Sequence, residues 1–183
     1  MIPPSLTDES VILDGHTIAD VDAHLSGEDE EQARRFGWYP ARSTEDGVRA
    51  AIERWQEQWA VDGETRAFAL RERSTGELVG GCEIRIGDGA RAEMSYWVFP
   101  QFRGRGFAGS GVRLVCEWAF EQLSIARMEL YIEPDNLGSR GVARSVGFSE
   151  EGVLREHEQT PQGRRDMVLY SLLPSDLLGS QDN

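Results

Sequence analysis

The chain has 183 residues, of which 39% are hydrophobic and 28% charged, and this length and composition fit one globular domain with a sizeable core. The formal net charge of −13 argues against nucleic-acid binding, because a basic face must neutralise phosphates. No apolar run reaches the length of a membrane span and no secretory leader is recognisable at Met-Ile-Pro-Pro-Ser, so a cytoplasmic protein is expected.

The first elements are expected to be short. Residues 11–13 form a strand candidate, and Ile18, Val21 and Leu25 indicate a helix after it. The acidic run 27–31 reads as a solvated turn or the start of another helix.

The clearest early helix is expected over residues 43–60. Its apolar residues recur at spacings of four, three and four, at Val48, Ile52, Trp55 and Trp59. Ser43, with Asp46 three residues later, resembles a capping box at the start of this helix. The spacing predicts Trp55 and Trp59 to be core residues, whereas Trp38-Tyr39-Pro40 lies in an expected loop and is a candidate wall of a substrate cleft.

The rest of the chain alternates strands and helices. A hairpin of residues 66–73 and 77–86 precedes a strand at 92–99. The later elements are a helix, a strand, a helix ended by Gly147, and a closing hairpin, at residues 107–123, 127–133, 136–146, 148–158 and 167–173. This order predicts a single α/β domain over residues 1–183, with a mixed, mostly antiparallel sheet of about seven strands flanked by helices. The tails 1–7 and 175–183 are expected to be flexible.

A glycine-containing loop between a strand and a helix is the first chemical signal. It reads Gln101-Phe-Arg-Gly-Arg-Gly106, and Gly104 and Gly106 allow backbone amides to approach a ligand closely. The free amides and dipole of the helix that begins at Phe107 favour an anion there, and Arg103 and Arg105 suit phosphate. A plain glycine turn with surface arginines is the alternative. The chain has no lysine, so this is not a lysine-dependent phosphate loop.

A second signal follows thirty residues later. Asn136-Leu-Gly-Ser139 opens a short helix directly after a strand, and Gly147-Phe148 ends that helix. Taken alone, Asn136 reads as a helix N-cap and Ser139 as a locally bonded hydroxyl. The two signals at this separation, in this order of strands and helices, are much less common by chance.

Together these motifs resemble those of the GNAT acetyltransferases. The loop is similar to their motif Q/R-x-x-G-x-G/A, and residues 93–108, 136–139 and 146–148 resemble the RimJ/RimL-type branch. The similarity covers roughly residues 8–173. It implies an acyltransferase in which a primary amine attacks the thioester of acetyl-CoA directly, through a tetrahedral intermediate, in a V-shaped opening between strands 92–99 and 127–133.

The resemblance also assigns residues to the acetyl-CoA site. The pyrophosphate is expected on the backbone amides of Arg103, Gly104, Arg105, Gly106, Phe107 and Ala108. A bulge at Trp97, Val98 and Phe99 is expected to offer amides to the pantetheine arm and the thioester carbonyl. Asn136 is expected to bond the arm, and Ser139 to lie near the sulfur and protonate the departing thiolate. Other members use a tyrosine further along this helix, where Ala143 stands here.

The attacking amine needs a base, because only its neutral form is nucleophilic. Glu93 is the first candidate, with a purely structural role as its alternative, and Glu83, Glu133 and Asp135 are weaker candidates. No metal site is expected. The three histidines, His16, His24 and His157, show no triad or metal spacing and are expected at surface or satisfied positions, and Cys82 and Cys116 as buried free thiols.

The acceptor amine is expected to be cationic. In similar proteins the segment after the first strand, here residues 14–64, forms the acceptor side. It falls in the acidic third of the chain, where residues 1–64 carry 15 acidic residues against five arginines, and solubility is the alternative reason for these acids. A protein N-terminus of ribosomal-protein type is the first hypothesis, and a polyamine or aminoglycoside is the second. A non-catalytic acyl-CoA-binding protein is a third, and a homodimer is compatible with the resemblance.

Overall fold

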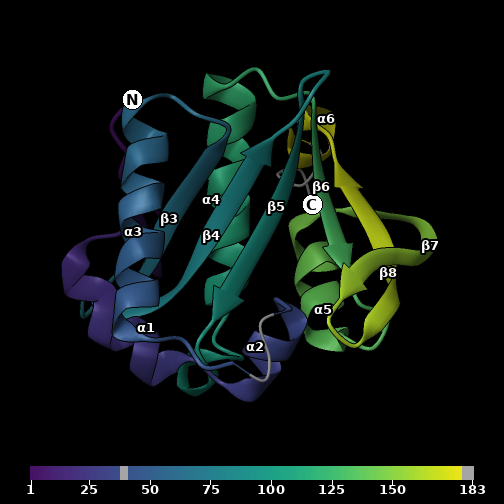
Figure 1. Ribbon diagram of the computed structural model, residues 1–183. Helices are drawn as coiled ribbons and strands as arrows, with labels where there is room; N and C mark the ends of the chain where they lie inside the picture. The colour runs from purple at the N-terminus through teal and green to yellow at the C-terminus, as the bar shows by residue number, and fades with distance from the viewer. Residues whose placement is uncertain (38–40, 179–183) are drawn as a thin grey trace.

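The computed structural model describes residues 1–37 and 41–178, and its centre is one twisted sheet (Figure 1). The eight strands lie in the order β1-β2-β3-β4-β5-β6-β8-β7. They are β1 Leu6–Thr7, β2 Val11–Asp14, β3 Thr65–Glu72, β4 Leu78–Ile86, β5 Arg91–Val98, β6 Arg127–Ile132, β7 Ser149–Thr160 and β8 Gly163–Leu172. All neighbours are antiparallel except β5 and β6, so the predicted mixed α/β sheet is confirmed. The eighth strand is the two-residue β1, which pairs with β2.

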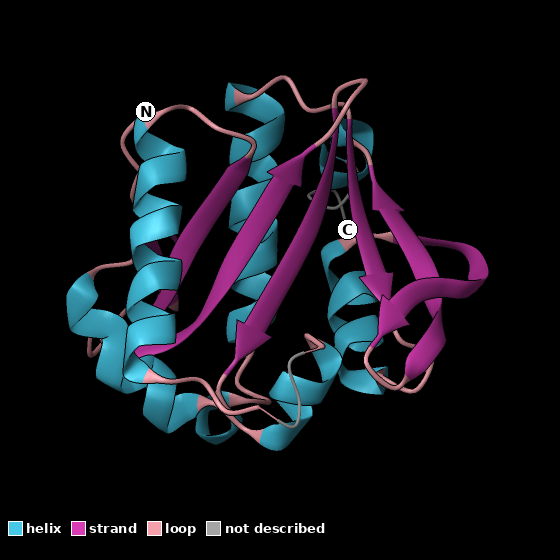
Figure 2. Ribbon diagram, viewed as in Figure 1, coloured by secondary structure: helices cyan, strands magenta, loops and turns pink. Residues whose placement is uncertain are grey.

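Helices cover both faces of this sheet (Figure 2). They are α1 Val21–Gly27, α2 Glu30–Arg35, α3 Glu45–Ala60, α4 Phe107–Gln122, α5 Leu137–Val146 and α6 Pro174–Leu178, with short 3-10 turns at Ile18–Asp20 and Pro100–Phe102. Helices α1 and α3 lie on one face, and α4 lies with α5 on the other. In the described ranges, every helix is too short or too polar to cross a bilayer.

The ends of the helices follow from local capping. The hydroxyl of Thr44 accepts the amide of Gly47 at 3.1 Å and begins α3, so the predicted Ser43 cap is wrong by one residue. Asp29 begins α2 in the same way, which resolves the acidic run as a helix start. Gly147 ends α5 with a φ of 109°, as predicted.

The core lies between the sheet and its helices. Trp59 of α3 packs edge-on against Phe68 of β3 at 5.1 Å between ring centroids, and Trp118 of α4 completes the cluster. Trp59 is a core residue, as predicted, and its indole N–H donates to the carbonyl of Ala67. Cys82 and Cys116 are buried free thiols, also as predicted, and burial raises the pKa of Cys82 to about 12.

The sheet separates in its middle. Strands β5 and β6 pair only from Arg91–Glu93 to Arg127–Glu129, after which they diverge (Figure 1). Strand β6 then continues beside β8, so the gap has one free edge on each side. This divergence is the opening expected between strands 92–99 and 127–133.

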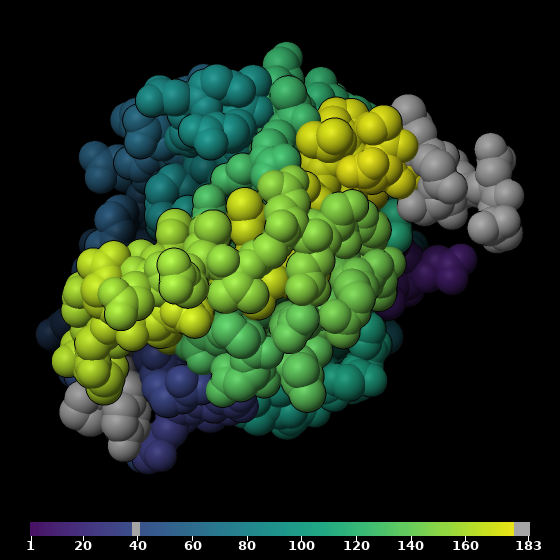
Figure 3. All heavy atoms as spheres, turned by 90° about the vertical axis from the view of Figure 1, so that its right-hand side faces the viewer, coloured from purple at the N-terminus to yellow at the C-terminus, as the bar shows by residue number. Residues whose placement is uncertain are grey.

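The far side of the gap is formed by α5 and the long β7–β8 hairpin. Figure 3 looks onto this face, where the yellow-green hairpin reaches the dark-blue region of α2. The contact is direct, because Arg165 of β8 donates to the carbonyl of Arg35 at 2.6 Å. Helix α2 therefore lies across one end of the gap and contacts the β7–β8 hairpin.

Candidate functional site

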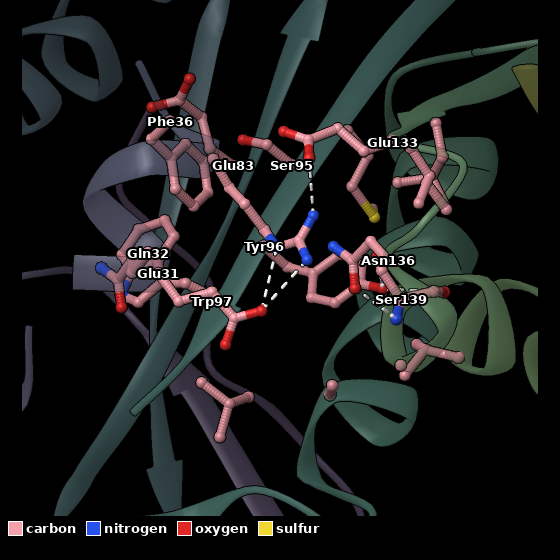
Figure 4. Close-up of a pocket in the computed structure, with 18 of the residues that line it drawn as sticks. Glu31, Gln32, Phe36, Glu83, Ser95, Tyr96, Trp97, Glu133, Asn136 and Ser139 are labelled. Atoms are coloured by element: carbon pink, nitrogen blue, oxygen red, sulfur yellow. Dashed lines mark hydrogen bonds and ion pairs between the residues drawn. The ribbon is translucent and has the colours of Figure 1, made fainter. Parts of the chain in front are cut away.

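A cleft of about 1510 Å³ passes through the gap and joins the two faces of the sheet. Every sequence-predicted site residue lines it except Phe99 and Arg105. Figure 4 shows Glu31, Gln32, Phe36 and Trp97 on one side, with Glu133, Asn136 and Ser139 on the other. The structure thus brings together the glycine loop, the candidate base and the second motif.

The glycine loop is shaped to receive an anion. Gly104 and Gly106 have φ angles of 75° and 84°, and a Cβ at either position would point into open space. Gly106 is the N-cap of α4, and it provides no side-chain cap for the first-turn amides. The positive end of a 16-residue helix therefore faces the cleft with its N–H groups available. These features fit a pyrophosphate group.

The two loop arginines are already engaged by acidic residues. Arg103 pairs with Asp29 at 2.9 Å and donates from Nε to the carbonyl of Val98 at 3.0 Å. Arg105 pairs with Glu72 and lies over the ring of Phe107, away from the cleft lining. The hydrogen-bond donors that the loop presents to the cleft are consequently backbone amides, because carboxylates hold both arginines.

The edge of β5 presents donors without the predicted bulge. Pairing with β4 runs in unbroken register from Ala92 to Val98, so a bulge at Trp97–Phe99 is contradicted. The amide of Phe99 donates to Val79 at 2.9 Å and is not available. Because amides alternate in direction along an antiparallel strand, those of Tyr96 and Val98 point to the gap.

Tryptophan side chains form the wall on the α3 face. Trp97 lies on Gly81, where an added Cβ would come within 2.3 Å of its ring. Trp55 stacks 6.0 Å from Trp97, lines the cleft and donates from Nε1 to Glu83 at 2.9 Å. Trp55 is half-buried and packs against the cluster of Val21, Val48 and Ile52, so the prediction of a core residue is confirmed only in part. Trp38-Tyr39-Pro40 lies outside the described residues.

Two histidines pack behind this wall. His16 is 3% exposed and stacks on Trp55 at 4.5 Å. Its Nε2 has no hydrogen-bond partner within the described part of the chain, so the expected surface or satisfied position is wrong. Its Nδ1 lies 3.4 Å from Nε2 of His24, which lines the cleft. Burial, followed by the neighbouring His24, lowers the pKa of His16 to about 3. His157 stacks on Tyr131 at the other wall.

Burial of His16 predicts an acid-sensitive fold. The unfolded chain binds a proton near pH 6.5, well above the folded pKa of about 3, so stability falls as the pH drops through this range. Between about pH 7.5 and pH 5 the loss attributable to His16 is about 2 kcal/mol. Urea unfolding at both pH values should show that His16→Phe loses most of this difference. An unchanged difference in the variant would contradict the prediction.

The four candidate carboxylates differ in their partners. Glu133 contacts Arg34, Arg35 and Arg165, and Asp135 also pairs with Arg35. Glu83 accepts from Trp55 and pairs with Arg85.

Glu93 is placed differently from the other three. It is exposed, and it is the last residue of β5 that pairs with β6. Its carboxylate makes no hydrogen bond or ion pair with residues 1–37 or 41–178. Glu93 therefore differs from the other three candidates in standing without an ionic partner among these residues, at the point where the strands separate.

The second motif joins a residue that sequence reasoning missed. Asn136 accepts the amide of Ser139 at 3.1 Å, which is the N-cap role. The hydroxyl of Tyr96 lies 2.5 Å from Oγ of Ser139, reaching from β5 across the gap to α5. Ala143 is fully buried and contributes no polar group. The alternation of side chains along a strand indicates that Tyr96 and Trp97 face opposite sides of the sheet. It does not indicate that Tyr96 contacts Ser139 across the gap.

Comparisons with known proteins agree with this geometry. Residues 10–149 match the acetyltransferase (GNAT) domain family. The N-acetyltransferase YjcK of Bacillus subtilis (strain 168) is 31% identical over 87% of this chain and 91% of its own. YdaF from the same strain, named as a ribosomal N-acetyltransferase, is 30% identical over 71% and 70%. Mycobacterium smegmatis RimJ, solved with CoA-disulfide, has the same fold, with a TM-score of 0.80 and 23% identity over 97% and 92% of the chains.

Proposed function

The chain belongs to the GNAT acetyltransferase family, and from this premise we propose that it transfers the acetyl group of acetyl-CoA to the N-terminal amine of a polypeptide. The observation that carries the proposal is the cleft itself. It joins the glycine loop on one face of the sheet to an aromatic and acidic wall on the other, through the gap between β5 and β6.

The donor half of the proposal rests on backbone groups. The amides of residues 104–108 would hold the pyrophosphate, and the gap-facing amides of Tyr96 and Val98 would bond the pantetheine arm and polarise the thioester carbonyl. Asn136, whose Oδ1 caps α5, would present its amide nitrogen to the same arm. When bound, acetyl-CoA supplies the activated acetyl group.

The acceptor half is proposed from size and charge. The cleft extends beyond the glycine loop and runs from α1–α3 to the β7–β8 hairpin, which leaves an elongated acceptor side. Of the acidic first third of the chain, Glu28 and Glu31 line it. Glu31 pairs with Arg35 and Arg103, whereas Asp14 and Asp20 lie away from the cleft and are held by Arg71. The name of the relative YdaF supports a protein acceptor. These features favour a cationic peptide end.

Glu93 is proposed as the base. It would take a proton from the acceptor ammonium, directly or through one water, and leave the neutral amine able to attack the acetyl carbonyl. Glu93 and Ser139 both line the cleft, which speaks against a protein that only binds acyl-CoA.

The proposal is tested first at the loop. Gly104→Glu places a carboxylate where the pyrophosphate is expected, and it should raise the Kd for acetyl-CoA roughly tenfold or more. Calorimetric titration measures this directly. Gly89→Glu is the matched control, because Gly89 has a φ of 69° against 75° for Gly104 and equally open space, yet it lies outside the cleft lining.

The two outcomes separate clearly. Affinity lost with Gly104→Glu and kept with Gly89→Glu supports the loop as the pyrophosphate site. Thiol release with a panel of short peptides, compared with spermidine and an aminoglycoside, then tests the acceptor. If the wild-type protein does not bind acetyl-CoA, the proposed function is wrong. If spermidine is the only acceptor that is turned over, the acceptor is a polyamine and not a peptide.

A further inference from the structure

One tyrosine lies on the same face of the sheet as the proposed base. Tyr131 belongs to β6 and lines the cleft, as Glu93 of β5 does. Glu93 pairs with Glu129 where β5 and β6 run in parallel, and side chains alternate along a strand. Glu93, Glu129 and Tyr131 therefore project from one face of the sheet, on the side where Trp97 forms the opposite wall of the cleft.

The proton of the Tyr131 hydroxyl is committed to a buried carboxylate. It is donated to Oε2 of Glu129 at 3.0 Å, while Nε of Arg127 donates to Oε1 of the same carboxylate at 2.6 Å. Glu151 holds the other side of that guanidinium at 2.8 and 2.9 Å. A carboxylate paired with arginine only accepts hydrogen bonds, and a phenol has a single proton to donate. Any further hydrogen bond of Tyr131 is consequently one that its oxygen accepts.

A bulge in β7 holds the ring of Tyr131 in place. The β7–β8 register shifts after Leu154, and Glu156 within the shift has a φ of 50°, although it is not a glycine. Its amide donates to Asp166 at 2.7 Å, which stabilises this backbone. The next residue, His157, stacks on Tyr131 with ring centroids 4.9 Å apart and planes 5° apart. The phenol oxygen thus has a fixed position at the cleft.

The chain contains a second phenol bonded to a carboxylate, and there the oxygen also accepts from a cation. The hydroxyl of Tyr170 donates to Glu150 at 2.6 Å, and its oxygen accepts from Nε of Arg140 at 3.0 Å. Tyr170 is fully buried and is not part of the cleft lining. Within residues 1–37 and 41–178, no donor is bonded to the oxygen of Tyr131. Its accepting side is therefore available to a cation that enters the cleft.

We infer that the phenol oxygen of Tyr131 accepts a hydrogen bond from the acceptor amine, and that Glu129 fixes the direction of this bond. An ammonium group has three N–H donors. Glu93 receives the proton of one, and a second donates to Tyr131, so the nitrogen stays in place after the proton has left and its lone pair can attack the acetyl carbon. Tyr131 keeps its own proton throughout. The inference rests on the proposed transfer to an amine with Glu93 as base.

Tyr131→Phe tests the contact, because it keeps the ring on His157 and removes only the oxygen. KM for a peptide amine is expected to rise roughly tenfold, as for the loss of a hydrogen bond to a charged group, with the Kd for acetyl-CoA unchanged. Tyr170→Phe is the matched control. It removes the same oxygen from a carboxylate-bonded tyrosine outside the cleft lining and should leave KM unchanged.

Glu129→Gln tests the direction of the bond. Because Nε of Arg127 requires the oxygen of the new amide, the amide nitrogen faces Tyr131 and donates to it. The phenol proton then turns toward the cleft and opposes a cation, so KM should rise although Tyr131 is still present. Since both substitutions remove the same accepting oxygen, their effects should not add in the double variant.

The outcomes separate this inference from the proposed function. An unchanged KM in either single variant, or additive effects in the double variant, overturns the inference and leaves the proposed function intact. A wild-type protein that binds no acetyl-CoA, or that acetylates no amine, overturns the proposed function instead. Calorimetric titration of each variant with acetyl-CoA shows that the proteins compared are folded.

Discussion

Glu93→Gln is expected to lower kcat/KM for a peptide amine by about 10²-fold or more, with acetyl-CoA affinity unchanged. The substitution keeps the shape of the side chain but removes the proton acceptor at the point where β5 and β6 separate. Thiol release measured over a pH series checks the result. Because an N-terminal amine has a pKa of about 7.7–8.0, the deficit should shrink as the pH rises and the amine loses its proton in solution.

The pH series separates a base from a binding residue. A residue that only attracts the acceptor would show a raised KM at every pH, whereas loss of a base is compensated by alkaline pH. Glu77→Gln, on an exposed turn outside the cleft lining, serves as the control and should leave the rate unchanged. Wild-type activity in Glu93→Gln across the series would leave Glu93 a structural residue.

Gly80→Ala is expected to destabilise the fold more than other single methyl additions to this sheet. A Cβ on Gly80 would lie 2.1 Å from the carbonyl oxygen of Trp97 and 3.0 Å from Cα of Val98, so the backbone of β5 must move. Overpacking of this kind costs about 1–3 kcal/mol, which corresponds to a fall in Tm of about 2–12 °C for a chain of this length. Thermal unfolding followed by circular dichroism measures the fall.

The matched control lies in α5. An added Cβ on Gly141 meets no atom within 4 Å, and the residue sits inside a helix, so Gly141→Ala should raise stability by up to about 1 kcal/mol. Opposite signs for the same chemical change would show that contact with β5 decides the outcome at Gly80. An unchanged Tm in Gly80→Ala would contradict the close approach of the two strands.

Local patterns predicted the parts of the site that depend on neighbours in sequence. The glycine loop, the start of α4 at Phe107 and the left-handed cap at Gly147 are set by backbone conformations that few residues adopt, so they were visible in the sequence. The Thr44 cap was missed by one residue because Ser43 stands beside it and serine is the more common N-cap of the two.

The parts that were missed depend on contacts between distant segments. Helical spacing correctly placed Trp55 on the apolar face of α3. It could not show that Trp55 lines the cleft and donates a hydrogen bond to Glu83 of β4. His16 offered no spacing signal, because its burial comes from packing under Trp55 and Trp97. The loop arginines were predicted to face phosphate, and acidic partners from α2 and β3 hold them instead.

Where β5 and β6 diverge, the sheet lacks the backbone hydrogen bonds that would join two neighbouring strands. Unpaired strand edges normally attract extended segments of other chains and promote aggregation. Here the two unpaired edges face each other across the gap between β5 and β6. A narrow molecule with carbonyl and amide groups fits between them, whereas the edge of another protein's sheet is too wide to enter. Because a ligand that binds only the folded state stabilises it by mass action, a filled gap should also protect the protein from heat and proteolysis. The supply of acyl donor in the cell would then govern how long the protein persists as well as how fast it works.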